Sequence, residues 1–278
     1  MVLLVLLVLF APLPSWHPSP NRLSFSVRIL DVLLTPAEFQ RLPNRDLSRS
    51  ICVVFDVLRA TSTMLQAFAN GARAIRPAMD IPEALEWYRD WPDALLAGER
   101  DGIRIGPQLT GGIEFHLGNS PREFTRETVR GRRFLMTTSN GTRALRSCQH
   151  AAAVLIASFA NISAVAERVL DADPDELIIV CSGTQEASAY EDVLGAGALV
   201  DRLSPKLQGV RIDDAAHLVR NAYRLAKDDL LASMENSRNG RRLLNLPDLA
   251  PDVPLCLQID RFDFVPEMDR NGVITRPI

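Results

Sequence analysis

Four short segments of this sequence combine acidic, hydroxyl and amide side chains. They are residues 56–63 (DVLRATST), 98–102 (GERDG), 117–121 (LGNSP) and 137–142 (TTSNGT). Carboxylates bind Mg²⁺, while hydroxyls, amides and the free N–H groups of a helix start bind phosphate oxygens. The four segments therefore predict Mg²⁺-dependent phosphate chemistry that needs neither His nor Cys.

Three carboxylates are the predicted metal ligands: Asp56, Glu99 and Asp192. Asp56 and Glu99 each stand where an apolar strand candidate ends, and Asp192 lies near the start of a helix candidate, next to Glu191. Ligands collect at such strand ends in open α/β sheets. The alternatives are an exposed turn for Glu99 and, for Asp192, a charge that complements the helix dipole.

Arg59 joins Asp56 and Glu99 in the predicted catalytic set, because its planar guanidinium suits phosphate or sulfonate. Thr61 and Ser62 open the helix candidate behind it, whose N–H groups favour an anion. The alternative is that these hydroxyls only cap the helix and that Asp56 forms an ion pair with Arg59. The predicted substrate-binding residues are Thr61, Ser62, Arg100, Asn119, Ser120, Thr138, Asn140, Gly141 and Thr142. For Asn119 and Ser120 the alternative is that one of them only caps a helix that starts at Pro121.

Several familiar chemistries are not supported. Residues 137–142 form neither a Walker A motif nor a G-x-G-x-x-G fingerprint, and the chain has no G-x-S-x-G elbow. Leu58 stands where D-x-D phosphatases carry a second acid, which favours a metal-activated water over an aspartyl phosphate. No His has a partner at metal-ligand spacing, so no His receives a catalytic role.

Short apolar runs alternate with helical patterns, which is typical of a parallel sheet covered on both faces. The strand candidates are Val27–Leu34, Ile51–Phe55, Arg73–Arg76, Ala94–Ala97, Arg133–Met136, Val154–Ala157, Leu177–Cys181 and Leu255–Ile259, with another near Val273. The helix candidates are Thr61–Asn70, Ile81–Asp90, Pro121–Val129, Thr142–Cys148 and Ile162–Leu170, and residues 188–237 look mostly helical. We therefore expect a three-layer α/β/α fold with a mostly parallel sheet and a helical C-terminal part, and an irregular loop over Gly98–Gly118.

Composition narrows the class of protein. The chain has 278 residues, 31 Lys and Arg against 34 Asp and Glu, and a net charge of −3, with no basic block. These values argue against a nucleic-acid partner. Its 4 Cys lie far apart and form no C-x-x-C pair, so they are expected to be buried thiols in a cytoplasmic protein.

The first ten residues are wholly apolar, and a Pro-rich stretch follows them. The run is too short to span a membrane and lacks the basic start of a secretory signal. We interpret residues 1–24 as an extension, disordered or upstream of the true start, and residues 25–278 as one enzyme domain; a weak export signal or anchor is the alternative.

Taken together, the motifs resemble the 2-phosphosulfolactate phosphatase (ComB) family. The matching pieces are residues 56–63, 98–100, 117–121, 137–142, 158–161 (SFAN) and 191–194 (EDVL), in the family's order over residues 27 to 275. The departures are Gly195, where relatives often carry Cys, and Ser139, where Thr is common. The resemblance implies a ComB-like fold, Mg²⁺ as cofactor and hydrolysis of 2-phospho-3-sulfolactate to sulfolactate, a step of coenzyme M biosynthesis, with Arg59 and Arg100 suited to the substrate's anions.

A protein that binds small phosphorylated or sulfonated anions without turnover is the alternative function. The expected partner is a small phosphorylated molecule, with neither nucleic acid nor membrane. Exposed apolar residues on the C-terminal helices would permit a homodimer.

Overall fold

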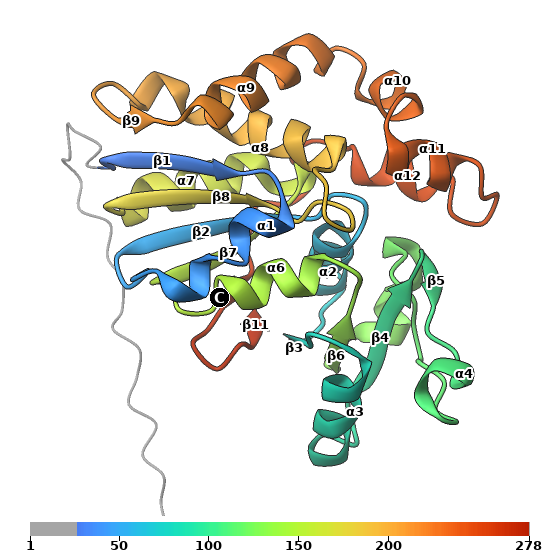
Figure 1. Cartoon of the computed structure of the whole chain (residues 1–278). Coiled ribbons are helices and arrows are strands. Elements are labelled where there is room, and N and C mark those ends of the chain that lie inside the picture. The colour runs from blue at the N-terminus through green and yellow to red at the C-terminus, as the bar shows by residue number, and fades with distance from the viewer. Residues whose placement is uncertain (1–26, 278) are drawn as a thin grey trace, which may run out of the picture.

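The computed structural model describes residues 27–277. The predicted extension, residues 1–24, lies outside this range. Within it the chain forms one eleven-stranded sheet with helices on both faces (Figure 1). The predicted three-layer α/β/α fold with a mostly parallel sheet is confirmed.

All seven predicted strands between residues 27 and 181 form, and most of their residues are buried. The strands are β1 (Ile29–Leu33), β2 (Ser50–Phe55), β3 (Ala74–Pro77), β4 (Leu95–Arg100), β5 (Ile103–Arg104), β6 (Arg133–Thr137), β7 (Ala153–Ala157), β8 (Glu176–Cys181), β9 (Arg211–Ile212), β10 (Glu267–Met268) and β11 (Ile274–Thr275). Every residue of β2 is buried, as expected for a strand covered on both faces.

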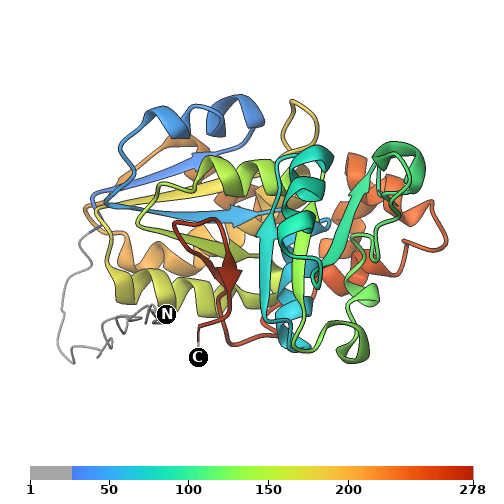
Figure 2. The same cartoon turned by 90° about the horizontal axis from the view of Figure 1, so that it is seen from below.

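The sheet consists of two parallel groups joined by a C-terminal hairpin. Its strand order is β5-β4-β6-β3-β11-β10-β7-β2-β8-β1-β9. One group consists of the parallel strands β7, β2, β8, β1 and β9, and the other of the parallel strands β3, β6 and β4. β10 and β11 pair antiparallel with each other, and each of them pairs antiparallel with one of the two groups. Figure 2 shows this hairpin, in red, at the middle of the sheet. Because three antiparallel pairings separate the two groups, the strands of one group run opposite to those of the other.

Helices cover each face of the sheet. The helices are α1 (Pro36–Phe39), α2 (Ala60–Ala69), α3 (Ile81–Asp90), α4 (Pro107–Thr110), α5 (Arg126–Val129), α6 (Gly141–Ser147), α7 (Ile162–Ala172), α8 (Tyr190–Leu203), α9 (Asp214–Ala226), α10 (Leu230–Glu235), α11 (Arg238–Leu244) and α12 (Asp252–Cys256), with 3₁₀ turns η1 (Leu42–Asn44), η2 (Pro121–Glu123), η3 (Phe159–Asn161) and η4 (Ser204–Lys206). Apolar side chains of α1, α2 and α6 pack on one face, and those of α7, α8 and α9 pack on the other.

Three sequence predictions of local structure are wrong. Residues 255–259 are not a strand, because Leu255 and Cys256 end helix α12 instead; a short apolar run looks the same in a strand and in a buried helix turn. The helix expected over Pro121–Val129 is interrupted at Phe124, between η2 and α5. The region Gly98–Gly118 is less irregular than predicted, because β4 continues to Arg100 and pairs with β5.

The four cysteines are buried free thiols, as predicted. No helix within residues 27–277 has the length and apolar character that crossing a membrane requires.

Candidate active site

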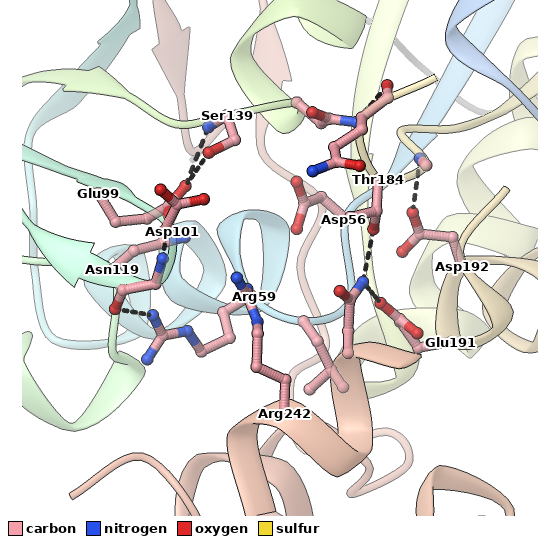
Figure 3. A pocket seen from close by; sticks show the side chains of 16 residues that line it. Asp56, Arg59, Glu99, Asp101, Asn119, Ser139, Thr184, Glu191, Asp192 and Arg242 are labelled. Carbon is pink, nitrogen blue, oxygen red and sulfur yellow. Dashed lines mark hydrogen bonds between the residues drawn. The ribbon is translucent and has the colours of Figure 1, made fainter. Parts of the chain in front are cut away.

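A cavity of about 120 Å³ lies at the carboxyl ends of β2, β6 and β8, beside the end of β4 (Figure 3). Its lining residues are Asp56, Leu58, Arg59, Glu99, Asp101, Gly102, Asn119, Ser139, Asn140, Gly183, Thr184, Gln185, Glu191, Asp192, Asn239 and Arg242. They come from both parallel groups and from the C-terminal helices. This is the place where open α/β sheets bind ligands.

Asp56 directly follows β2 and lies against the first turn of α2. Its Oδ1 accepts a hydrogen bond from the Ala60 N–H at 2.9 Å, and no hydrogen bond reaches Oδ2 from any described residue. A Cβ added at Gly141 would lie 2.5 Å from Oδ2, so glycine there leaves room for this carboxylate. Burial, together with the nearby Glu99 and Glu191 charges, raises the Asp56 pKa to about 7, although the Ala60 N–H opposes the rise.

Asp192 and Glu191 lie in the first turn of α8, and both are buried. Asp192 accepts from the Val57 N–H at 2.8 Å through Oδ1 and from the Gly183 N–H at 3.1 Å through Oδ2. Glu191 accepts from Asn239 at 2.5 Å through Oε1, whereas its Oε2 is buried without a partner. Burial raises the pKa of both carboxyls, and the charges of Asp56 and Glu191 raise that of Asp192 further.

Glu99 lies inside β4 and not in a turn after it. Both of its carboxylate oxygens accept hydrogen bonds: Oε1 from the Ser139 N–H at 2.9 Å and the Ser139 hydroxyl at 3.0 Å, and Oε2 from the Gly102 N–H at 2.6 Å. Glu99 is only 6% exposed, which rules out the alternative of an exposed turn. Its contacts tie β4 to the segment that follows β6.

Arg59 lines the cavity but is already paired within the protein. Its Nη1 donates to the buried Asp252 carboxylate at 2.7 Å, and its Nη2 donates to the Gly102 carbonyl at 3.0 Å. Asp252 also accepts from Ser120 and Arg122. The alternative of an Asp56–Arg59 ion pair is therefore wrong, and most of the Arg59 charge is neutralised before any ligand binds.

The structure brings together only part of the predicted site. Asp56, Arg59, Glu99, Asn119, Asn140 and Asp192 line the cavity, whereas Thr61, Ser62, Arg100, Ser120, Thr138, Gly141 and Thr142 do not. The hydroxyls of the second group bond inside the protein, as Thr61 does to the Asp56 carbonyl and Ser62 to the Val57 carbonyl. These side chains shape the loops around the cavity.

The sequence interpretation missed the C-terminal contribution. Asn239 and Arg242 come from α11, a helix without a motif of its own, and Thr184 and Gln185 follow β8. Asn239 donates to both Thr184 Oγ1 and Glu191 Oε1 at 2.5 Å. Asn239 and Arg242 share one helix face because they are three residues apart, a spacing that could have suggested a common target.

The oxygen ligands around the cavity suit a hard divalent cation by their chemistry, but they do not form a complete coordination shell. The cavity offers carboxylate oxygens without His or Cys, as Mg²⁺ prefers. Within residues 27–277 no three such side chains converge on one point, so the three predicted ligands do not form a preformed cage. Mg²⁺ commonly uses one or two carboxylates with water and substrate oxygens, and the free oxygens of Asp56 and Glu191 suit that mode.

Comparison with known proteins gives a consistent picture. The family model described as 2-phosphosulpholactate phosphatase matches residues 37–271. A protein of Caldanaerobacter subterraneus subsp. tengcongensis named "Probable 2-phosphosulfolactate phosphatase" is 35% identical over 244 residues, covering 87% of this chain and 97% of its own. Proteins of the same name from a Synechococcus species and from Thermosynechococcus vestitus are 39% and 37% identical, over 80% and 85% of this chain and 90% and 96% of their own. The chain belongs to the 2-phosphosulfolactate phosphatase family.

Proposed function

We propose that this protein is a Mg²⁺-dependent phosphatase that hydrolyses 2-phospho-3-sulfolactate to sulfolactate and phosphate. Membership of the family and the names of its relatives support the phosphatase activity and the substrate. The Mg²⁺ dependence rests on the charge of the cavity.

That charge is the observation that carries the proposal. Five carboxylates line the cavity, Asp56, Glu99, Asp101, Glu191 and Asp192, against two guanidinium groups, of which that of Arg59 is paired with Asp252. A phosphomonoester is itself an anion, so each of these carboxylates that is ionised would repel it from this cavity. A bound divalent cation reverses the repulsion and, when present, polarises the phosphoryl oxygens.

Asp56 and Glu191 are the residues that would hold Mg²⁺. Each is buried, and each keeps one carboxylate oxygen free of hydrogen bonds from the described residues. Asp192 and Glu99 would contribute negative charge beside the ion, because both oxygens of each already accept hydrogen bonds. Of the ligands expected from the sequence, this assignment keeps Asp56, adds Glu191 and moves Glu99 and Asp192 from direct ligands to neighbouring charges.

The remaining groups orient the substrate. Asn119 is buried at the cavity and its side-chain Oδ1 has no partner, so it can accept a hydrogen bond from an ordered water or from the hydroxyl of the product sulfolactate. Arg59 fixes the loop between β2 and α2 through Asp252 and Gly102. Leu58 stands where D-x-D phosphatases carry their second acid, so we expect water and not the Asp56 carboxylate to attack phosphorus. Acid-quenched enzyme should then carry no phosphoryl adduct on Asp56 by mass spectrometry.

Phosphate release from 2-phospho-3-sulfolactate, with Mg²⁺ and with excess chelator, tests the proposal. We expect turnover that chelator abolishes and added Mg²⁺ restores. Chelator-insensitive turnover would refute the metal dependence, and no turnover of any phosphomonoester would favour the anion-binding alternative. The cytoplasmic location, the role in coenzyme M biosynthesis and a homodimer stay predictions from the sequence.

A further inference from the structure

The cavity contains one cation that the sequence interpretation overlooked. Arg242 projects from α11 into the cavity (Figure 3). Within residues 27–277 its guanidinium has neither a hydrogen bond nor an ion pair at contact distance, although its charge lowers the Glu191 pKa from a distance. Arg59, the other lining cation, has Asp252 and Gly102 as partners. Arg242 is therefore the lining guanidinium that is available to a ligand.

The position of Arg242 is fixed by the rest of α11. Ser237 caps the helix by accepting from the Gly240 N–H at 2.9 Å, and Leu243 is buried in the core. Asn239, one turn before Arg242, anchors the same helix face to Glu191 and Thr184. The helix thus presents Arg242 to the cavity while its own side chain stays exposed at the rim.

Arg242 also lies beside the loop that carries the other site residues. A Cβ added at Gly102 would lie 3.7 Å from Arg242 Nη2. The Gly102 N–H donates to Glu99 and its carbonyl accepts from Arg59. The free guanidinium therefore stands at the rim, next to the loop that holds Glu99 in place.

We propose that Arg242 is a specificity residue that binds a second anion of the substrate, a carboxylate or sulfonate on the carbon skeleton that carries the phosphate. This inference rests on the proposed function and deepens it by assigning a residue to one of the two acid groups that the substrate carries besides its phosphate. The cation that Asp56 and Glu191 would hold would serve the phosphoryl group, whereas the other anion needs a cation of its own in a cavity rich in carboxylates. A guanidinium meets the need because its planar fork matches such oxygens.

The test compares three esters on wild-type enzyme and on two variants, Arg242→Gln and Arg241→Gln. The esters are 2-phospho-3-sulfolactate, 2-phospholactate, which lacks the sulfonate, and isopropyl phosphate, which lacks both acids. Arg241 is the matched control, since it is an exposed neighbour that bonds the Asn236 carbonyl and does not line the cavity. Calorimetric binding of sulfolactate in the presence of Mg²⁺ gives a readout that does not require turnover.

We expect Arg242→Gln to lower kcat/KM for 2-phospho-3-sulfolactate about tenfold, mainly through KM, as loss of one hydrogen-bonded charge contact implies. It should weaken sulfolactate binding by a similar factor and change turnover of isopropyl phosphate less than about twofold, while Arg241→Gln changes none of these. The 2-phospholactate result tells which acid is bound: an equal loss points to the carboxylate, and no loss to the sulfonate.

An equal loss for all three esters, or none for any, overturns the inference while leaving the phosphatase proposal intact. If the wild type hydrolyses no ester, the phosphatase proposal fails, and sulfolactate binding alone decides the role of Arg242. Unchanged sulfolactate binding by Arg242→Gln then overturns the inference.

Discussion

The Asp56 carboxyl gives the sharpest test of a metal-binding cavity, through the substitution Asp56→Asn. This change keeps the side chain's shape, and the new amide oxygen can still accept from the Ala60 N–H. The substituted amide cannot ionise, and ionisation is what burial beside Glu99 and Glu191 makes unfavourable for Asp56. Asp101→Asn, an exposed acid of the same cavity, is the matched control.

The size of the effect follows from the Asp56 pKa, which lies at about 7 in the folded protein against an ordinary value of 3.8. Since one pKa unit corresponds to about 1.4 kcal/mol, ionising Asp56 in the metal-free fold costs about 4 kcal/mol. At a pH between 3.8 and about 7, Asp56 in the folded state retains a proton that the unfolded chain has released. This contribution to stability is therefore complete below about pH 4 and lost as the pH rises through 7.

The assay is urea unfolding in chelator from pH 5 to pH 8, repeated with Mg²⁺. We expect Asp56→Asn to unfold with a weaker dependence on pH than wild type and to be more stable at pH 8. Mg²⁺ at a hundred times its Kd should stabilise wild type by about 3 kcal/mol and the variant far less. Equal pH dependence of the two proteins, or equal stabilisation by Mg²⁺, would refute the reasoning; Asp101→Asn should behave as wild type.

Three further substitutions test other parts of the site. Glu191→Gln should weaken Mg²⁺ binding about tenfold or more in calorimetry, and wild-type affinity would remove Glu191 from the ligands. Arg59→Gln leaves the buried Asp252 without its main partner and should lower the free energy of unfolding by about 3 kcal/mol in urea; a change under about 1 kcal/mol would show that Arg122 and Ser120 suffice. Gly141→Ala places a Cβ 2.5 Å from Asp56 Oδ2 and 2.8 Å from the Ala60 Cβ, so both kcat/KM and the free energy of unfolding should fall, and unchanged kinetics would show that Asp56 can move without consequence.

Local patterns were enough to predict most of the fold. The buried strands are apolar runs of ordinary length, and Asp80 caps α3 where the sequence places its start, accepting from the Glu83 N–H at 2.9 Å. The strand predicted over residues 255–259 is wrong because periodicity does not distinguish a short apolar strand from a buried helical turn. The hairpin of β10 and β11, only two residues per strand, gives almost no local signal.

The site was predictable to the extent that strand ends specify it. Asp56 and Asn140 follow strands and Glu99 lies near the end of one, which marks each of them as a candidate. Their convergence was not predictable, because the β10–β11 hairpin reverses one parallel group relative to the other. Which hydroxyls face the cavity was not predictable, because Thr61 and Ser62 satisfy backbone groups of their own loop. Asn239 and Arg242 were not predicted as site residues, because their position depends on how α11 packs against the rest of the protein. That packing is a property of the tertiary structure and has no local sequence signal.

The ion pair between Arg59 and Asp252 joins residues 193 positions apart, and this separation matters while the protein is being made. A growing chain that has not yet reached Asp252 already contains β2, α2 and every acid of the cavity, but no anion for the guanidinium that the finished fold buries. The pocket therefore matures only after nearly the whole polypeptide has been synthesised. Premature termination upstream of this aspartate also removes β10 and β11, which join the two strand groups, so such fragments should lack both a joined sheet and a complete cavity.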